Sequence, residues 1–432
     1  MRRLSLVLLI GFLGLEGLYG HMAHLQDLRQ EARLFLHDVV IALLVYLIVV
    51  WWLRRCLAHT ASSTTRWMIV GIVMGGVVFR LTLVGLTPTL SDDIYRYLWD
   101  GRVQLAGIDP YRYAPNDAAL AWLRTDEWQR LNHPDIPTVY PPLMQGAFRL
   151  AAWLSPTVLM QKAVFVICDL LLVGVLPFLL VRWGISPLMS LIYAWHPLVV
   201  IEVAGSGHND VLGALCLVVG LSLWHQHRRA VGTMVLALGF LAKFVTVLLW
   251  PFYLIKARRL LIVFVAVVVL GGWSCVSSPH FTPGLWHYAR PWEFNSFLYS
   301  VLLAVLHDPF LVRLLGGLIV LGAGFVLARR TDDLVAYTVT LLQLSLVFAP
   351  VVEPWYLLWV IPLWCVRFSW IWVIWSGLTM LSYVVLVRFV QDGIWELPVW
   401  VKWIEYGPLA AFSLMRWVRG RHRAPSPAAS GP

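Results

Sequence analysis

The residues best suited to catalysis lie in one polar segment, residues 91–111, which reads SDDIYRYLWDGRVQLAGIDPY. Asp92 and Asp93 stand side by side at its start, shortly after a long apolar run and a proline. A carboxylate close to a helix N-terminus and to an arginine stays ionised at neutral pH, and a general base must be ionised. We therefore take Asp92 and Asp93 as candidate catalytic residues, with Asp92 as the general base.

The same segment also has a purely structural interpretation. Asp92, Arg96 and Asp100 are four residues apart, so on a helix they form one stripe of ion pairs, with Ser91 as the N-cap. Arg96, Asp100 and Arg102 would then support the acidic loop without touching a substrate. Two adjacent acids could also hold a divalent cation, but the sequence requires none. We assign no metal ligand and no cofactor.

Two more polar features interrupt apolar runs. The turn GSGHND carries His208 and Asp210, which either cap the following helix or recognise a phosphate or a sugar hydroxyl. Lys243 lies in the middle of the apolar run 231–255, where a lysine costs a few kcal/mol unless it is paired or solvated. A lipid phosphate would be a good partner, and Asp169, also within an apolar run, is the competing one. The sequence leaves both open.

Several aromatic and charged residues could line a sugar site. Tyr140 lies in the motif VYPP, Arg290 and Trp292 in the loop HYARPWEFN, and Glu353 and Trp355 in the motif EPWY. Tryptophans and tyrosines are enriched at membrane interfaces, so these residues could equally form an ordinary aromatic belt. Beside a polar site the same rings would stack on the faces of sugars. We expect Tyr140, Arg290, Trp292, Glu353 and Trp355, with His208, Asp210 and Lys243, to bind the donor phosphate or the sugar.

The composition indicates a membrane protein. Of the 432 residues, 60% are hydrophobic and only 13% are charged. Repeated apolar runs have the length that a helix needs to cross a bilayer, about 17 to 25 residues. The net charge of +10 does not indicate nucleic-acid binding, because the basic residues fall mostly in short loops between apolar runs, as the positive-inside rule expects. The five cysteines are dispersed, which excludes a disulfide framework and a cysteine zinc site.

The basic loops predict an all-α bundle of about 12 transmembrane helices, or about 14 if residues 231–255 cross fully as a hairpin, with both termini inside. Residues 1–420 would form one transmembrane domain, followed by a disordered cytoplasmic tail over 421–432. The first apolar run favours an uncleaved anchor over a signal peptide. Residues 88–156 would be an external catalytic loop, with 143–154 lying along the interface. Residues 277–309 would be a second external loop.

This topology was set by the basic residues alone, yet it delivers all the polar motifs above to the external face. Random scatter over about a dozen loops would rarely do so. The sequence therefore predicts one site, sunk into the external end of the bundle.

The motifs resemble a known family. SDDIYRYLWDGRVQLAGIDPY, VYPPL, LIYAWHPL, GSGHND, LAKF and EPWYLLW, in this order from about Pro88 to Trp359, are similar to the type C (GT-C) membrane glycosyltransferases, in particular to bacterial polyprenyl-phosphate-mannose-dependent α-mannosyltransferases. Here the acidic loop follows a third apolar run, whereas many relatives have it after the first.

The resemblance implies a GT-C-like bundle, a polyprenyl-phosphate sugar donor and inverting transfer, with mannose as the expected hexose, to a lipid-linked or envelope glycan at the external leaflet of a plasma membrane. It matches Asp92 to the base, Asp93 to the second acid and Asp100 to a supporting one. His208 and Asp210 match the polar turn that faces the site, and Lys243 a lysine that could contact lipid phosphate. The rival class is a flippase or transporter of lipid-linked sugars, in which the ionisable groups would be exposed alternately to both sides.

Overall fold

The computed structural model describes residues 2–57, 65–289 and 292–421. Arg290 and residues 422–432 of the predicted tail lie outside the described residues. Within the described ranges the chain is helical, and its one β-pairing is an isolated parallel bridge between Phe294 and Val351. The predicted all-α class is confirmed.

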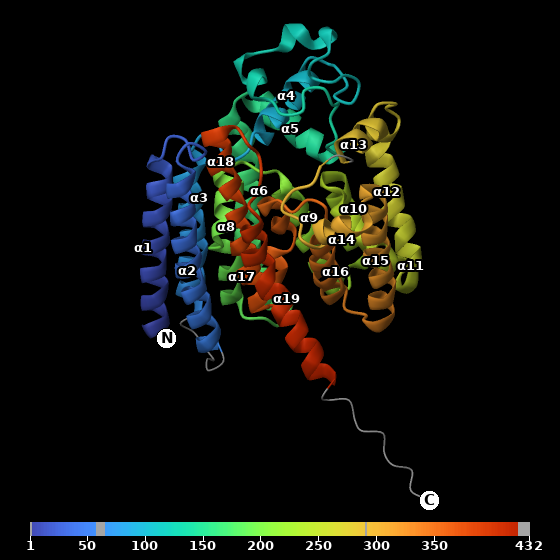
Figure 1. Ribbon diagram of the computed structural model, residues 1–432. Coiled ribbons are helices and arrows are strands. Elements are labelled where there is room, and N and C mark those ends of the chain that lie inside the picture. The colour runs from blue at the N-terminus through green and yellow to red at the C-terminus, as the bar shows by residue number, and fades with distance from the viewer. Residues whose placement is uncertain (1, 58–64, 290–291, 422–432) are drawn as a thin grey trace, which may run out of the picture.

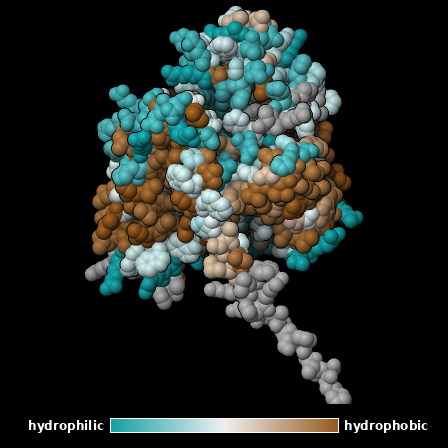
Figure 2. Space-filling model, viewed as in Figure 1, coloured by the Kyte–Doolittle hydropathy of each residue, from teal (hydrophilic) through white to brown (hydrophobic). Residues whose placement is uncertain are grey.

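Seven helical segments in the described ranges are long and apolar enough to cross a membrane. Their apolar side chains form the brown belt of Figure 2. The segments are α1 (Arg2–His24), α2 (Ala32–Leu57), α3 (Thr65–Val84), α6 (Val158–Arg182), α12 (Arg258–Val276), α15 (Pro309–Arg330) and the run formed by α17 (Trp370–Leu378), η8 (Thr379–Tyr383) and α18 (Val384–Asp392).

Helix α2 illustrates why these runs pack as they do. Its buried positions include Phe35, Val39, Ala42 and Tyr46, which recur every three or four residues and therefore share one face. The opposite face exposes further leucine, isoleucine and tryptophan side chains. A helix that is apolar all round, with one face packed and the other exposed, fits a lipid-facing position at the edge of a bundle.

The other apolar runs are shorter or interrupted. Residues 187–205 form two helical pieces that meet at a bend of 58°. The first piece ends with α7 (Leu191–Ala194), and the second begins with α8 (Pro197–Val200). The 12 to 14 runs counted in the sequence thus correspond to seven continuous spans, this bent pair and several short helices, because hydropathy does not reveal where a helix breaks inside a bundle. The short helices are α9 (Asp210–His225), α10 (Arg229–Ala242), η5 (Phe244–Leu249), α11 (Trp250–Lys256), α16 (Leu334–Phe348), η6 (Pro354–Trp359) and η7 (Ile361–Cys365).

The run 231–255 is a hairpin of two helical arms, as predicted. It breaks at Lys243, whose backbone is extended between α10 and η5. The arms return side by side, since Thr246 donates a hydrogen bond to the Leu236 carbonyl and Tyr253 donates one to Thr233. The break leaves Lys243 at the turn, free of the regular helix.

A cap of short helices covers one end of the bundle (Figure 1). It comprises α4 (Asp93–Leu105), η1 (Ala118–Leu123), η2 (Asp126–Arg130) and α5 (Pro142–Leu154), and we use "cap" for residues 93–154. Gly101 lets α4 and α5 approach closely, because a Cβ there would lie 2.6 Å from the Phe148 carbonyl oxygen. Residues 143–154, predicted as an interfacial helix, form α5 at this end. Helix α13 (Phe281–Ala289) lies beside it.

Candidate active site

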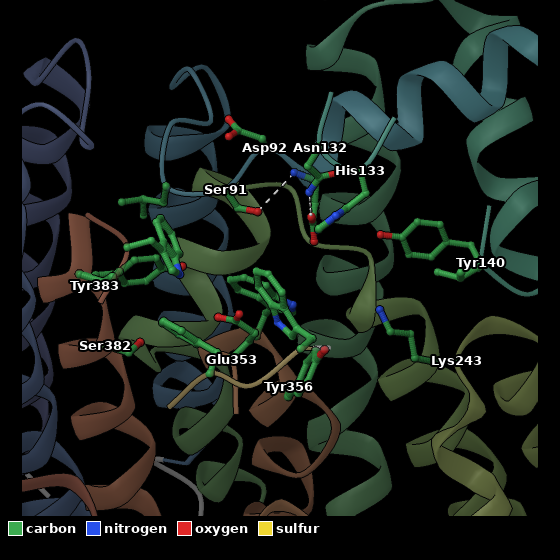
Figure 3. A pocket seen from close by; sticks show the side chains of 18 of the residues that line it. Ser91, Asp92, Asn132, His133, Tyr140, Lys243, Glu353, Tyr356, Ser382 and Tyr383 are labelled. Atoms are coloured by element: carbon green, nitrogen blue, oxygen red, sulfur yellow. Dashed lines mark hydrogen bonds between the residues drawn. The ribbon is translucent and has the colours of Figure 1, made fainter. Parts of the chain in front are cut away.

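A cavity of about 450 Å³ lies where the cap meets the bundle. Figure 3 shows that its side chains come from segments far apart in the sequence; Lys243 and Tyr140 point into a shared space, and the Asp92 carboxylate lies at its outer rim. The walls are formed by residues 90–93, 132–141 and 243–245, the segment 353–359, and residues of η8 and α18. Arg29, from the connection between α1 and α2, also lines the cavity, as do Leu285, Trp292, Phe294 and Trp395. The cavity brings seven of the predicted site residues together with others that the sequence did not single out; the seven are Asp92, Asp93, Tyr140, Lys243, Trp292, Glu353 and Trp355.

Asp92 stands at the N-cap position of α4 and lines the cavity, with its side chain 37% exposed. The predicted stripe of ion pairs requires that the Asp92 carboxylate pair with Arg96. That pair does not form, because Arg96 pairs with Asp100. Arg29 instead donates a hydrogen bond of 2.8 Å to Asp92 Oδ1. The predicted cap residue, Ser91, accepts the Asp93 backbone N–H with its side-chain oxygen. The arginine that pairs with Asp92 thus lies 63 residues upstream.

Asp93 begins α4 and faces the same cavity. Asn132 of the cap donates a hydrogen bond of 2.6 Å to its carboxylate. Burial raises the pKa of Asp93 above its usual value, while the Asn132 bond and the positive charge of Lys243 oppose that rise. Both acids are partly exposed, but their partners differ: Asp92 pairs with the charged Arg29, whereas Asp93 is bonded to the neutral amide of Asn132.

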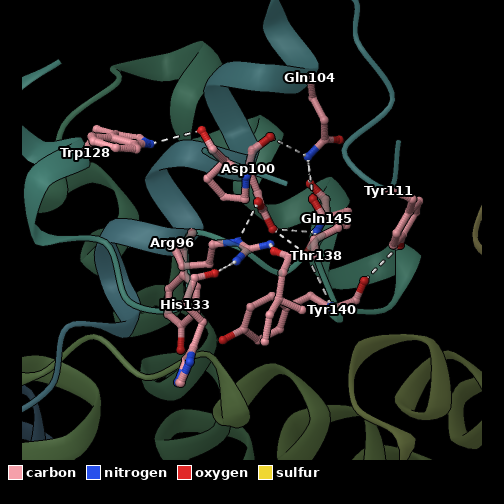
Figure 4. A network of polar contacts seen from close by, with 12 residues as sticks. Arg96, Asp100, Gln104, Tyr111, Trp128, His133, Thr138, Tyr140 and Gln145 are labelled. Atoms are coloured by element: carbon pink, nitrogen blue, oxygen red, sulfur yellow. Dashed lines mark hydrogen bonds and ion pairs between the residues drawn. The ribbon is translucent and has the colours of Figure 1, made fainter. Parts of the chain in front are cut away.

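Arg96 and Asp100 pair with each other inside the cap, at 3.0 Å, and do not line the cavity. The Arg96 guanidinium also donates to the carbonyls of His133 and Ile136. Asp100 accepts further hydrogen bonds from Thr138 and Gln145 (Figure 4). This network holds the segment 133–138 in place and so positions Asn132 and Tyr140 on the cavity wall.

Arg102 lies apart from this network. Its guanidinium contacts Thr125 and Glu127 at the partly exposed outer side of the cap. It supports the cap, as the structural interpretation of the acidic loop expects.

Lys243 points into the cavity from the hairpin turn, with its side chain 20% exposed. Its ammonium group donates to Asn209 Oδ1 at 3.0 Å and lies 3.1 Å from Asp210 Oδ1. The ring of Tyr140 lies 5.5 Å away, within range of a cation–π interaction. Asp169, the competing partner in the sequence, pairs with another residue. Lys243 therefore carries a positive charge that is anchored on one side and open to the cavity on the other.

The turn with His208 and Asp210 lies behind the cavity wall. Both side chains are buried and neither lines the cavity, so the predicted direct contact with phosphate or sugar is not formed by these side chains. His208 stacks on Trp355 with ring centroids 3.8 Å apart, and Asp210 accepts a hydrogen bond of 2.8 Å from Trp359. The sequence predicts that both residues lie at the same end of the bundle as the other polar motifs. In the structure, tryptophans separate their side chains from the cavity.

Gly207 explains how this turn fits beneath the cap. Its φ of +79° lies in the left-handed region that favours glycine, and a Cβ there would lie 2.6 Å from the Ile94 side chain. The turn can therefore pack directly against the first turn of α4.

Aromatic rings form the wall that carries the motif EPWY. Trp355 lines the cavity, and Tyr356 stacks on Trp359 with ring centroids 5.0 Å apart. Trp292 lies opposite, edge-on to His133 at 5.6 Å. Flat aromatic surfaces of this kind bind the apolar faces of sugars while leaving hydroxyls free for polar partners.

Glu353 is the acidic residue of this aromatic wall. It is 7% exposed, and no hydrogen bond from another described residue reaches its carboxyl group. Burial raises the pKa of Glu353 well above its usual range, and the nearby charges of Asp93 and Glu202 raise it further. A carboxyl group in this state can donate and accept hydrogen bonds with sugar hydroxyls.

Sequence reasoning missed Arg29, Asn132, His133 and Tyr383 of the cavity lining. Asn132 and His133 lie in the motif NHPDIP, whose prolines and polar residues by themselves indicate only a turn. Among the described residues, no group of three or more histidine, cysteine, aspartate and glutamate side chains is arranged to hold a metal ion. The candidate site thus consists of carboxylates, cations and aromatic rings.

Comparison with known proteins assigns the chain to a family. A family model described as the N-terminal domain of alpha-(1->6)-mannopyranosyltransferase matches residues 8–259, more than half of the chain. The chain belongs to this family. The matched residues include the acidic pair, Lys243 and Arg29, whereas the aromatic wall around Glu353 lies beyond them.

One curated relative is alpha-(1->6)-mannopyranosyltransferase A of Mycobacterium tuberculosis (strain ATCC 25618 / H37Rv). It is 28% identical over an alignment of 245 positions, and this alignment covers 53% of this chain and 44% of that protein. The chain thus matches less than half of the length of this relative. No solved structure matches the chain.

Proposed function

We propose that this membrane protein is a mannosyltransferase that moves a mannosyl residue from a polyprenyl-phosphate donor to an acceptor hydroxyl of a lipid-linked or envelope glycan, with inversion. The observation that carries the proposal is the cavity between cap and bundle, where an acidic pair, a lysine and an aromatic wall converge. Membership of a mannopyranosyltransferase family supports mannose as the sugar.

The reaction would proceed by direct displacement at the anomeric carbon. Asp92 accepts the proton of the acceptor hydroxyl while that oxygen forms the new bond to the anomeric carbon. The bond from this carbon to the phosphate oxygen breaks, and its electron pair leaves with polyprenyl monophosphate. Attack on the face opposite the phosphate inverts the configuration. The leaving phosphate needs a cation and no general acid, because it is a weak base.

Lys243 supplies that cation. Its ammonium group is fixed by Asn209 and Asp210 and opens onto the cavity, so it would meet the donor phosphate without reorganising. Asp210 has a supporting role here, since it anchors the lysine from behind the wall. A charge-assisted bond from lysine to phosphate is roughly twice as strong as a neutral hydrogen bond.

The sugar would lie between the acidic wall and the aromatic wall. Trp355 offers a ring face, backed by the stacked His208. Asp93 and Glu353 are placed to hydrogen-bond sugar or acceptor hydroxyls, and Tyr140 and Trp292 close the sides of the cavity. Together these contacts would hold the anomeric carbon within reach of Asp92 and fix the direction of attack.

A second, apolar groove of about 430 Å³ provides a place for the donor's isoprenoid tail. It is lined by α11, α15 and α16 together with residues 247–248 of the hairpin. Arg313 of α15 lines the groove and donates a hydrogen bond of 2.9 Å to the carbonyl of Trp292, which lines the cavity. A lipid with its phosphate at Lys243 could therefore extend its tail along this groove into the bilayer.

We place the cavity at the external leaflet of the plasma membrane. Basic residues end the helices that run away from the cap, including Arg54 and Arg55 of α2, Arg182 of α6, and Arg329 and Arg330 of α15. Basic residues mark the cytoplasmic side of membrane proteins. The absence of an Asn-x-Ser/Thr glycosylation acceptor in the sequence agrees with a bacterial plasma membrane.

Replacement of the base tests this proposal. Asp92→Asn in membranes supplied with labelled polyprenyl-phosphate mannose should reduce transfer by about 10²-fold or more, because the acceptor hydroxyl loses its proton acceptor. Asp126→Asn is the matched control, since Asp126 is an exposed cap carboxylate that does not line the cavity. Transfer by Asp92→Asn at the wild-type rate, in folded protein, would remove Asp92 from the mechanism. If purified wild-type protein in liposomes translocated the donor without forming a glycoside, the protein would be a transporter and the proposed transferase activity would be wrong.

A further inference from the structure

The connection between α1 and α2 forms a tight turn at the rim of the cavity. The Asp27 carboxylate accepts the backbone N–H of Arg29 at 2.8 Å and that of Gln30 at 3.2 Å. The Asp27 carbonyl accepts the backbone N–H of Glu31 at 3.0 Å. A short polar side chain that bonds to its own following backbone holds such a turn in one shape. The turn therefore presents Arg29 in a defined direction.

Arg29 is attached to the start of the acidic motif at three points. Its backbone N–H donates to the Thr89 hydroxyl at 3.3 Å, its Nε donates to the Thr89 carbonyl at 2.7 Å, and its Nη2 donates to Asp92 Oδ1 at 2.8 Å. A guanidinium that bonds through two nitrogens to two acceptors is fixed in both position and orientation. The Arg29 side chain is only 24% exposed, so its charge is less screened than that of a fully solvated pair.

Other charged groups near Asp92 are engaged elsewhere or carry the same sign. Arg96 pairs with Asp100 inside the cap. Arg130 of η2 donates to the Tyr95 hydroxyl, and its exposed charge lies near both Asp92 and Asp27. Asp93 and Asp27 are acidic neighbours that disfavour a further negative charge. Among the described residues, Arg29 makes the one ion pair to Asp92.

We propose that Arg29 is a positioning residue that holds the Asp92 carboxylate aimed at the acceptor, so that the base is assembled from two segments distant in the sequence. The inference rests on the proposed function, because it assigns Arg29 a role through Asp92. Arg29 occupies Oδ1 and leaves Oδ2 to take the proton. The α1–α2 hairpin is thereby part of the reaction centre as well as of the membrane bundle.

The test compares Arg29→Gln with Arg29→Lys in the full-length protein, with labelled polyprenyl-phosphate mannose as the donor. The glutamine keeps a hydrogen-bond donor but is too short to bridge Thr89 and Asp92, so the Asp92 carboxylate loses its fixed orientation. Its kcat should fall roughly 10- to 100-fold while the donor KM changes little, because a misplaced base slows the chemical step.

Arg29→Lys keeps the charge but cannot bridge Thr89 and Asp92 as the planar guanidinium does. Because it can still contact the Asp92 carboxylate, its kcat should lie between those of wild type and Arg29→Gln, with an unchanged donor KM. Arg33→Ala is the control, since Arg33 is an exposed arginine on the same hairpin that lines no part of the cavity. It should behave as wild type.

The outcomes separate the two proposals. A wild-type kcat in Arg29→Gln, or a loss of activity that appears in the donor KM and not in kcat, would overturn the role of Arg29. Wild-type protein without any transfer activity would instead overturn the proposed function. Thermal melting of both variants in detergent shows that the comparison is made on folded protein.

Discussion

Two groups of ionisable residues in this protein have opposite characters. The buried pair of Arg80 in α3 and Asp169 in α6 is closed: Arg80 donates to Asp169 at 2.7 Å and to the carbonyls of Gly76 and Ala194, and Tyr193 donates to Asp169. The cavity group is open, since Lys243 and Glu353 both line the cavity, Lys243 with partners on one side only and Glu353 with no described hydrogen bond to its carboxyl group. Charge inside a membrane bundle therefore indicates a binding site only where its partners are incomplete.

The closed pair should have the largest effect on stability. Asp169→Leu leaves Arg80 buried without its counter-ion, which typically costs about 3–5 kcal/mol. The variant should unfold at a markedly lower temperature in detergent, with loss of activity as a consequence. The double variant Arg80→Met/Asp169→Leu should recover most of that stability, because two apolar side chains replace the pair. A double variant as unstable as the single one would show that the hydrogen bonds of the pair, and not only its charge balance, stabilise the fold.

The open group should affect activity more than folding. Lys243→Gln removes the cation that faces the donor phosphate but leaves an amide to bond to Asp210. We expect the kcat/KM for the donor to fall roughly 10- to 100-fold, a loss of about 1.4–3 kcal/mol of transition-state stabilisation. The melting temperature should change little, in contrast to Asp169→Leu. A large drop in melting temperature with unchanged kcat/KM would make Lys243 structural, like Arg80.

The apolar groove can be blocked without disturbing either group. Gly317 of α15 lines the groove, and nothing lies within 4 Å of a Cβ built on it, so Gly317→Phe should fit while filling the path of the tail. The KM for a long-chain donor should rise about fivefold, equivalent to about 1 kcal/mol, and the KM for a short-chain donor should rise less. Gly322→Phe is the matched control, because Gly322 has equally open space on the same helix outside the groove. Equal effects of the two variants on both donors would place the tail elsewhere.

Glu353 should give the smallest effect, visible in the pH profile. Because burial raises its pKa, the carboxyl group stays protonated until the pH exceeds that raised value. Its ionisation above that raised value places a negative charge beside Asp93 and should slow transfer. Glu353→Gln resembles the protonated form, so it should retain transfer within about threefold and lose this decline at higher pH. An unchanged decline at higher pH would show that another group titrates there.

The sequence predicted those features that depend on local pattern. Long apolar runs indicated an all-α membrane bundle, and basic flanks on both sides of residues 231–255 indicated the hairpin with its turn at Lys243. The positions of the later basic loops indicated that residues 143–154 do not cross, because a crossing there would put those loops on the wrong side. Residue type and the expected helix N-terminus pointed to Asp92 and Asp93. These inferences work because hydropathy and charge act on each segment independently of its neighbours.

The tertiary structure alone decided which charges meet. The local spacing suggested Arg96 as the partner of Asp92, but Arg29 forms that pair from a different hairpin. Lys243 pairs with Asp210 and Asp169 with Arg80, and Trp355 stands between His208 and the cavity. Such contacts depend on how separate helices pack, and each involves residues tens of positions apart. Because no periodicity connects these residues, the sequence determined which groups lie at this end of the bundle, and packing determined which of them share the cavity.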